Sequence, residues 1–368
     1  MKKTRIFALI LCAMLLLSAV SCSGTGKTDV TTPAPDTTAE ETPVTGSGDA
    51  SEESSGGEAS APADETTADE TSAAGTQDEV TTSTEPAASM KPAIWTLTGP
   101  SGNTVTLVGT MHVLKPSDFP IPEVLSERLN ASRVLAVECD TQEAEADINY
   151  QIAIMMKMFY TGGDSLKNHL SEKTYGILKR VFADFGIDVD LYVGRGVKPW
   201  AIYSMIDTLP LGEAGFDSSS GLDSYLMTEA KKKGIEIREV ESVDFQLDML
   251  ADQPDRLYEL LFEEYENVTK EEQIESLNAL HDAWASGEEM EVGEEDYTGF
   301  SESDAQILSA FYKAMYTDRN RGMADCVIDL LGKNYNSVFA VGAAHFPGEN
   351  GILKLLEKAG YTAVRIDY

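Results

Sequence analysis

The chain has 368 residues, a formal net charge of −34 and 42% hydrophobic residues, a composition that suits a soluble globular protein. Acidic residues far outnumber basic ones and no basic stripe is present, which excludes nucleic acid and electrostatic docking on anionic lipid as partners. Only four cysteines are present, so a disulfide framework is excluded and the hydrophobic core must hold the fold.

Residues 1–21 have the features of a bacterial lipoprotein signal peptide. A basic start is followed by an uncharged, mostly apolar run over residues 6–20, which is shorter than the roughly 20 residues of a membrane span. The run ends in Ala19-Val20-Ser21-Cys22, which resembles a lipobox, although leucine is usual at the first position. We therefore predict acylation of Cys22 and anchoring on the extracytoplasmic face of the membrane in the cell envelope. Simple cleavage after residue 21, followed by secretion, is the alternative.

Residues 22–90 are predicted to form a disordered, acidic tether rich in Thr, Ser, Ala and Glu. From residue 23 onward the stretch contains no Phe, Trp, Tyr, Leu or Ile, and its fifteen acidic residues stand against one lysine. Such a chain cannot bury enough apolar surface to offset the entropy that it would lose on ordering. The segment either lifts the following domain off the membrane or serves solubility alone.

Residues 91–368 are expected to form one α/β domain. Residues 93–98 predict the first half of a hairpin, and five β-branched or apolar runs predict further strands over residues 104–109, 133–138, 235–240, 337–342 and 361–366. Helical patterns over residues 220–233 and 350–359 each end beside a glycine and lead into a strand. Such strand–helix–strand units predict a mainly parallel central sheet with flanking helices.

Two long stretches do not fit simple crossovers between strands. Residues 142–214 and 245–316 show helical periodicity and little strand signal. We expect both to pack on the sheet as a helical insertion or as a lid.

A pattern that occurs twice in the chain is the most informative feature of the sequence. Residues 104–112 and 337–345 each predict a strand that ends in Gly-x-x-His, with a proline soon afterwards. Ligands bind beyond the carboxyl ends of the strands in parallel sheets, so His112 and His345 are expected at the functional edge. Only four histidines are present, and two of them occupy matching positions, which favours a functional site over ordinary turns.

A carboxylate joins these two histidines at the same edge. Glu138 ends the predicted strand over residues 133–138, so His112, Glu138 and His345 together supply two imidazoles and one carboxylate. This set suits a divalent metal ion (Zn²⁺, Mn²⁺, Fe²⁺ or Co²⁺) and leaves positions open for water, whose acidity the ion increases.

Glu241, Arg319 and Asn320 are the candidate catalytic residues. Glu241 follows the strand over residues 235–240 and suits a further ligand, an orienting group or a general base; a surface carboxylate beside Arg238 is the alternative. Arg319 and Asn320 are predicted to open a helix, where they suit an oxyanion or a substrate carboxylate. Arg319 could equally pair with one of the many acidic residues.

Three other polar residues are assigned no chemistry. Asp223 is expected to cap or charge the start of a helix. His169 and His281 do not lie in a repeated motif, and we expect them to be structural or on the surface.

These motifs, taken in order, resemble the motif series of the TraB/GumN family, which includes the Tiki metalloproteases. The resemblance covers nearly all of residues 92–368 and rests on Val108-Gly109-Thr110-Met111-His112, Glu138, Gly221-Leu222-Asp223, Glu241 with Gln246, Arg319-Asn320 and Val341-Gly342-Ala343-Ala344-His345-x-x-Gly348-x-x-Gly351. Cys139 beside the glutamate and Pro347 after the second histidine depart from the pattern without touching the ligand set.

The resemblance implies a metal-dependent hydrolase with the paired histidines and the glutamate as its metal site. It further implies peptide bonds as the substrate, because Tiki-type members cleave amino-terminal peptides of secreted proteins. Bacterial relatives are linked to pheromone shut-off and to polysaccharide gene clusters, so the family does not fix the substrate. Two hypotheses follow: a metallopeptidase acting on extracytoplasmic peptides or proteins, and a lipoprotein of the same fold that sequesters a peptide without turnover.

Overall fold

The computed structural model describes residues 90–289 and 297–368. The predicted signal peptide, the lipidation site Cys22 and nearly all of the predicted tether lie outside the described residues. Within these two ranges, no helix is both long enough and apolar enough to cross a membrane.

A six-stranded sheet forms the centre of the domain, in the order β4-β3-β5-β2-β1-β6. The strands are β1 (Ile94–Thr98), β2 (Thr104–Thr110), β3 (Val134–Val137), β4 (Glu236–Glu239), β5 (Ser337–Gly342) and β6 (Val364–Arg365). β4, β3, β5 and β2 run parallel to one another, whereas β1 is antiparallel to both of its neighbours. The predicted mainly parallel sheet is confirmed. β6 is shorter than predicted, because it is an exposed edge strand that pairs with β1 over two residues only.

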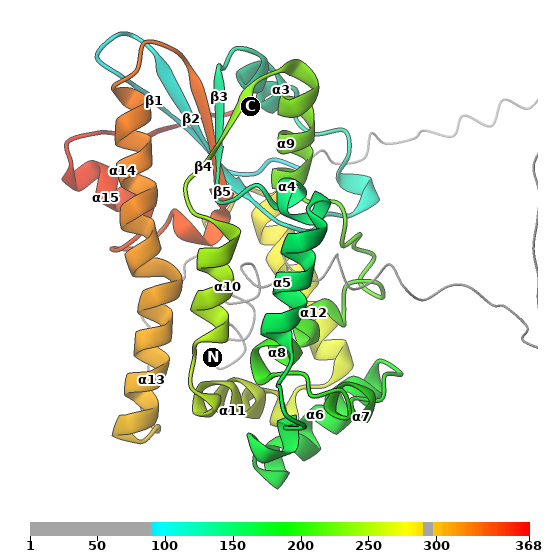
Figure 1. The fold of residues 1–368 in the computed structure, drawn as a ribbon. Coiled ribbons are helices and arrows are strands. Elements are labelled where there is room, and N and C mark those ends of the chain that lie inside the picture. The colour runs from blue at the N-terminus through cyan, green and yellow to red at the C-terminus, as the bar shows by residue number, and fades with distance from the viewer. Residues whose placement is uncertain (1–89, 290–296) are drawn as a thin grey trace, which may run out of the picture. The chain divides into compact units, whose positions relative to one another are not determined.

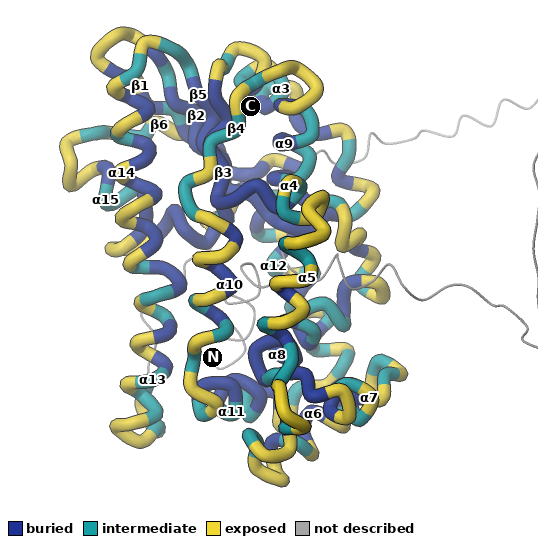
Figure 2. Tube along the Cα trace, in the orientation of Figure 1, coloured by how far each residue is buried: buried dark blue, intermediate teal, exposed yellow. Residues whose placement is uncertain are grey.

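Helices cover both faces of this sheet (Figure 1). Helices α3 (Glu123–Asn130) and α9 (Leu222–Lys233) lie on one face, and α14 (Arg319–Leu331) and α15 (Ile352–Lys358) lie on the other. Successive side chains of a strand point to opposite faces, so each strand supplies both cores. In β2, for example, Leu107 packs with the α14 side and Val108 with the α3 side. Figure 2 accordingly shows the central strands as the most continuously buried part of the fold.

The two long stretches between the strands are helical, as predicted. The first contains α4 (Thr141–Ala146), α5 (Ile148–Met158), α6 (Glu172–Asp184), α7 (Asp190–Val193) and α8 (Pro199–Thr208). The second contains α10 (Val243–Ala251), α11 (Asp255–Glu263), α12 (Lys270–Ala285) and α13 (Glu302–Tyr312). Most of these helices lie past the end of the sheet where β5 finishes (Figure 1), so they build walls around the carboxyl ends of the parallel strands.

Arg319 and Asn320 are the first two residues of α14, as predicted, but this end of α14 is not free. A π-helical turn (η5, Lys313–Asp318) joins α13 to α14, and the backbone of Asp318 is itself helical at φ −76° and ψ −37°. The two residues therefore lie inside one long helical run, where no free helix N-terminus is available to bind an anion. Single π-turns within helices often occur at functional sites.

Candidate metal centre

The three predicted ligands converge beyond the carboxyl ends of three adjacent strands. His112 follows β2, Glu138 follows β3, and His345 lies in a short turn after β5, the strand between the other two. A Cβ atom on Gly342 would lie 3.1 Å from Glu138 Oε1, 3.6 Å from His345 Cδ2 and 3.7 Å from His112 Nε2. The three side chains thus surround one small space, which the absence of a side chain at residue 342 keeps open.

His345 is buried and held in one orientation. Its Nδ1 lies 2.6 Å from the amide oxygen of Asn320, so Nδ1–H donates and Nε2 keeps its lone pair. Burial, reinforced by the Arg319 guanidinium, lowers the pKa of His345 to about 3, so the imidazole is neutral at physiological pH. Its Nε2 is buried without a hydrogen-bond partner among the described residues. This is the state that a metal-binding imidazole requires.

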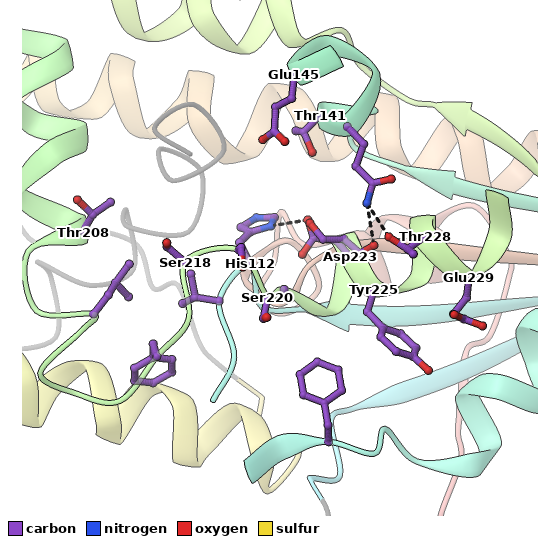
Figure 3. Close-up of a pocket in the computed structure, with 18 of the residues that line it drawn as sticks. His112, Thr141, Glu145, Thr208, Ser218, Ser220, Asp223, Tyr225, Thr228 and Glu229 are labelled. Atoms are coloured by element: carbon purple, nitrogen blue, oxygen red, sulfur yellow. Dashed lines mark hydrogen bonds and ion pairs between the residues drawn. The ribbon is translucent and has the colours of Figure 1, made fainter. Parts of the chain in front are cut away.

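His112 is oriented by a carboxylate that the sequence analysis assigned to a helix start. Asp223, in the first turn of α9, places Oδ2 3.2 Å from His112 Nδ1 (Figure 3). Burial opposes protonation of His112, but the Asp223 charge outweighs it and raises the pKa of the imidazole. Nε2 of His112 is again buried without a partner in the described part of the chain. A carboxylate behind a histidine is a common support for a metal ligand.

Gly221 allows this carboxylate to come close to the histidine. A Cβ atom at residue 221 would lie 2.5 Å from the carbonyl oxygen of His112, which no side chain tolerates. The glycine and the aspartate of the Gly221-Leu222-Asp223 motif therefore serve one contact. The helical periodicity of the sequence cannot reveal such a contact between two distant segments. The Gly221-Leu222-Asp223 motif was the only sequence feature that pointed to these residues.

Glu138 lies at the centre of a buried network of hydrogen bonds. Its Oε1 accepts from the backbone N–H of Gly342 at 2.7 Å and lies 3.8 Å from His345 Nε2. Its Oε2 accepts from Arg319 Nη2 at 2.6 Å and from Gln246 Nε2 at 3.1 Å. Burial alone would raise the pKa of Glu138, but Arg319 and the neighbouring imidazoles hold it far below its usual range. Glu138 is therefore a carboxylate at every physiological pH.

Arg319 bridges Glu138 to Glu241. Its Nε donates to both carboxylate oxygens of Glu241 at 3.0 and 2.9 Å, and its side chain is completely buried. Gln246 also donates to Glu241, so Gln246 holds both carboxylates and is a site residue that the candidate set omitted. Glu241 is not the surface carboxylate of the alternative interpretation, because its side chain is only 9% exposed and Arg238 pairs with Asp329 instead.

The donor set fits a divalent cation. Two imidazole Nε2 atoms without partners in the described part of the chain and one ionised carboxylate face the space beside Gly342, and imidazole and carboxylate are donors that Zn²⁺, Mn²⁺ and Co²⁺ accept. Within residues 90–289 and 297–368, however, no group of three or more His, Cys, Asp or Glu side chains is arranged so that it could hold a metal ion as it stands. The Arg319 guanidinium, which holds Glu138 Oε2, is the cation that neutralises this carboxylate in the structure.

A cavity of about 550 Å³ opens beside His112. Figure 3 shows His112 and Asp223 between α9 and the loop that carries Ser218 and Ser220. Thr141, Gln142 and Glu145 of α4 line the opposite part of the cavity. The volume lies in the range of small-molecule and peptide side-chain pockets. Of the three predicted ligands, His112 is the one that lines this cavity.

The other polar candidates are structural. His281 is buried on α12, where Nε2 lies 2.9 Å from Asp118 Oδ2, and His169 lies between Asp164 and Asp255. Cys139 and Cys326 are free thiols, and burial raises the pKa of Cys139 far above its usual value. None of these groups is positioned as a nucleophile.

Asp223→Asn is expected to weaken metal binding by roughly 10- to 100-fold, the usual effect of losing a supporting carboxylate behind a ligand. The asparagine keeps the shape of the side chain but removes the charge that orients His112. Isothermal titration with Zn²⁺ measures the change, and the thermal midpoint of the metal-free variant shows that the fold is intact. Unchanged zinc affinity would show that Asp223 acts only as a helix-start residue.

The metal-free chain is expected to lose stability as the pH falls from about 6.5 towards 3. The pKa of His345 is about 3 in the folded chain against an ordinary 6.5, so between these values only the unfolded chain binds the proton. The lowered pKa of Glu138 adds a further loss below about 4.5. Thermal midpoints over this range should fall less steeply in His345→Gln than in the wild type; parallel curves would show that His345 does not cause the loss.

Comparison with known proteins agrees with the motif order. The family model of the TraB/PrgY/gumN family matches residues 93–365, which include the whole candidate metal centre. The uncharacterized protein YbaP of Escherichia coli (strain K12) is 23% identical over 264 residues, which cover 71% of this chain and 90% of YbaP. The same protein of Shigella flexneri matches equally well. No solved structure matches the chain. The chain belongs to the TraB/PrgY/gumN family.

Proposed function

We propose that this protein is a metal-dependent hydrolase, and that it cleaves peptide bonds in extracytoplasmic peptides or proteins. One observation carries the proposal: two buried imidazoles present Nε2 atoms without hydrogen-bond partners to the same space as an ionised carboxylate, beside an open cavity. Two partnerless polar atoms at one buried point are costly unless a ligand satisfies them. His112, Glu138 and His345 would hold the ion.

The surrounding residues prepare this site for hydrolysis. A bound divalent ion would act as a Lewis acid towards a carbonyl group and a water molecule. Asn320 orients His345 through a hydrogen bond at Nδ1, and Asp223 orients His112 through a close contact at Nδ1. Glu241 would accept a proton from the attacking water; Arg319 Nε holds both of its carboxylate oxygens, and Gln246 Nε2 holds Oε2. Arg319 compensates the charge of two buried carboxylates in a place where water cannot.

Hydrolysis of a peptide library by the metal-loaded chain tests the proposal. Cleavage should require the divalent ion and should be lost in His112→Ala. Glu241→Gln should keep most of the metal and lose most of the activity, because the amide cannot accept the proton. A fully loaded wild-type chain that cleaves no peptide would contradict the peptidase.

The second candidate function is sequestration of a peptide without turnover. The ion pair between Arg319 and Glu138 favours it, because a guanidinium that satisfies the carboxylate makes a stable site without any ion. Binding of library peptides with equal affinity in the presence and absence of metal, and without cleavage, would favour this function over the first.

We place the domain on the extracytoplasmic face of the envelope through acylation of Cys22. Fatty-acid analogues should label the wild type, and Cys22→Ala should abolish the label and release the protein from the membrane fraction. The expected loss is complete, because the two cysteines that follow Cys22, Cys139 and Cys326, are both buried in the domain. Equal labelling or equal membrane retention of Cys22→Ala would refute the lipid anchor.

A further inference from the structure

The outer face of α5 carries an apolar patch that faces solvent. Ile148, Ile152, Met155 and Met156 are 64%, 50%, 53% and 73% exposed, and Phe245 of the adjacent α10 is 48% exposed. Ile148, Ile152 and Met156 are spaced four positions apart and Met155 follows Ile152 by three, so the four residues form one stripe along the helix. Figure 1 shows α5 and α10 side by side, and Figure 2 shows exposed positions along both. We call these five residues the α5 patch.

The opposite face of α5 already supplies the core contacts of the helix. Ile154 and Met158 are buried at 8% and 5% exposure and belong to the main hydrophobic core. A helix on the surface of a globular protein normally turns polar residues outward, whereas α5 is apolar on both sides. Clustered apolar residues with a polar rim mark interaction surfaces, and methionines suit surfaces that adapt to varied partners.

The rim of the α5 patch is acidic. Exposed carboxylates lie on the adjoining segments: Glu143 and Glu145 on α4, Asp147 directly before α5, and Asp244 and Asp248 on α10. One cation lies among them: Lys157, which pairs with Asp248 at 2.5 Å and lies 3.6 Å from Asp244. The rim therefore keeps a net negative charge. A partner that complements it carries apolar side chains together with several lysines or arginines.

The acidic rim disfavours three other occupants of the α5 patch: a second copy of the chain, an anionic lipid surface and an acidic segment of the chain itself. A second copy of the chain would bring one acidic rim against another, and an anionic lipid surface would be repelled. The chain's own residues 23–89 are strongly acidic and lack large apolar side chains, and residues 290–296 contain four acids. A cationic amphipathic segment of another polypeptide is the occupant that matches both the stripe and the rim.

The α5 patch follows, in the chain, the helix that lines the cavity beside His112. Thr141, Gln142 and Glu145 of α4 line that cavity, and α5 begins three residues later at Ile148. We infer that the α4–α5 surface binds cationic amphipathic peptide segments and leads them into the cavity. The inference rests on the proposed function and names its substrate class.

Binding of a labelled amphipathic peptide to the metal-free mature chain tests this inference. The probe is a helix of about 18 leucine and lysine residues, and the matched negative probe replaces each lysine with glutamate. Fluorescence anisotropy should show binding of the first peptide and none of the second. Ile152→Ser with Met156→Ser should weaken binding roughly tenfold or more, since two apolar contacts are lost. Asp147→Asn with Asp244→Asn should weaken it severalfold and reduce its salt dependence.

Leu191→Ser is the matched control, because Leu191 is 63% exposed on α7 and lies outside the patch. It should leave binding unchanged, and all variants should keep the wild-type thermal midpoint, since only exposed side chains change. Equal binding of both peptides, or full binding by the Ile152/Met156 variant, would overturn the inference. Dimerisation of the chain through the patch, or binding to phosphatidylcholine vesicles in place of the peptide, would also overturn it.

This binding assay needs neither metal nor cleavage. It therefore tests peptide binding by the α5 patch separately from the proposed peptide hydrolysis. If the chain binds the leucine–lysine peptide through the patch but never hydrolyses peptides, the proposed peptidase activity is refuted and the proposed peptide-binding surface stands. A chain that hydrolyses peptides with equal efficiency after loss of the patch keeps the peptidase and refutes the surface.

Discussion

Replacement of His112 or His345 with alanine is expected to remove nearly all of the divalent metal that the wild-type chain binds. Each histidine contributes one of the two buried Nε2 atoms without a partner, and two donors cannot hold the ion that three would hold. Loss of a supporting residue costs roughly 10- to 100-fold in affinity, so loss of a ligand should cost more. Metal analysis after equilibration with Zn²⁺, Mn²⁺ or Co²⁺ should give one ion per wild-type chain and almost none per variant.

His169→Ala is the control for this experiment. His169 also lies between two carboxylates, but it is partly exposed and remote from the three strand ends. It should keep the full metal content, whereas His281 is a poor control because it is buried against Asp118. Stoichiometric zinc in His112→Ala, or none in the wild type, would make both Gly-x-x-His motifs structural turns and leave sequestration as the leading function.

The placement of the predicted ligands could be inferred from sequence because topology determines it. Parallel strands bring their carboxyl ends to one edge, so a residue that follows a buried apolar run is placed at that edge by the strand alone. Two such strands were identified by the repeated Gly-x-x-His motif, which occurs as Gly109-x-x-His112 and as Gly342-x-x-His345. Glu138 followed a third strand. The central position of β5 between β2 and β3 then brings all three side chains together.

The groups that orient these ligands could not be inferred in the same way. Asp223 and Gln246 lie on α9 and α10, and their contacts depend on how those helices dock on the sheet. Periodicity reports which face of a helix is buried but not which side chain meets which partner. Pairing with an acidic residue was one of the two predicted roles of Arg319, but the sequence did not show which acids it meets. The arginine reaches two carboxylates that follow different strands, Glu138 after β3 and Glu241 after β4.

Arg319→Met is expected to have opposite effects on folding and on metal binding. Without the guanidinium, the side chains of Glu138 and Glu241, at 5% and 9% exposure, become unpaired buried charges, which costs about 3–5 kcal/mol of unfolding free energy. The same change frees Glu138 Oε2 and leaves a site that only a cation can neutralise, so zinc affinity should rise. Thermal melts should therefore show a large drop in the metal-free variant and a larger zinc-dependent recovery than in the wild type.

Arg256→Met is the control that distinguishes the effects of Arg319→Met on stability and zinc affinity from those of losing any arginine that pairs with a carboxylate. Arg256 also holds a carboxylate with two nitrogens, at Asp304, but its side chain is 40% exposed, so its loss should cost about 1 kcal/mol or less and leave zinc binding unchanged. If Arg319→Met instead loses zinc in parallel with stability, the arginine holds Glu138 in its binding position. The network would then support the metal site, and the guanidinium would not compete with the ion for the carboxylate.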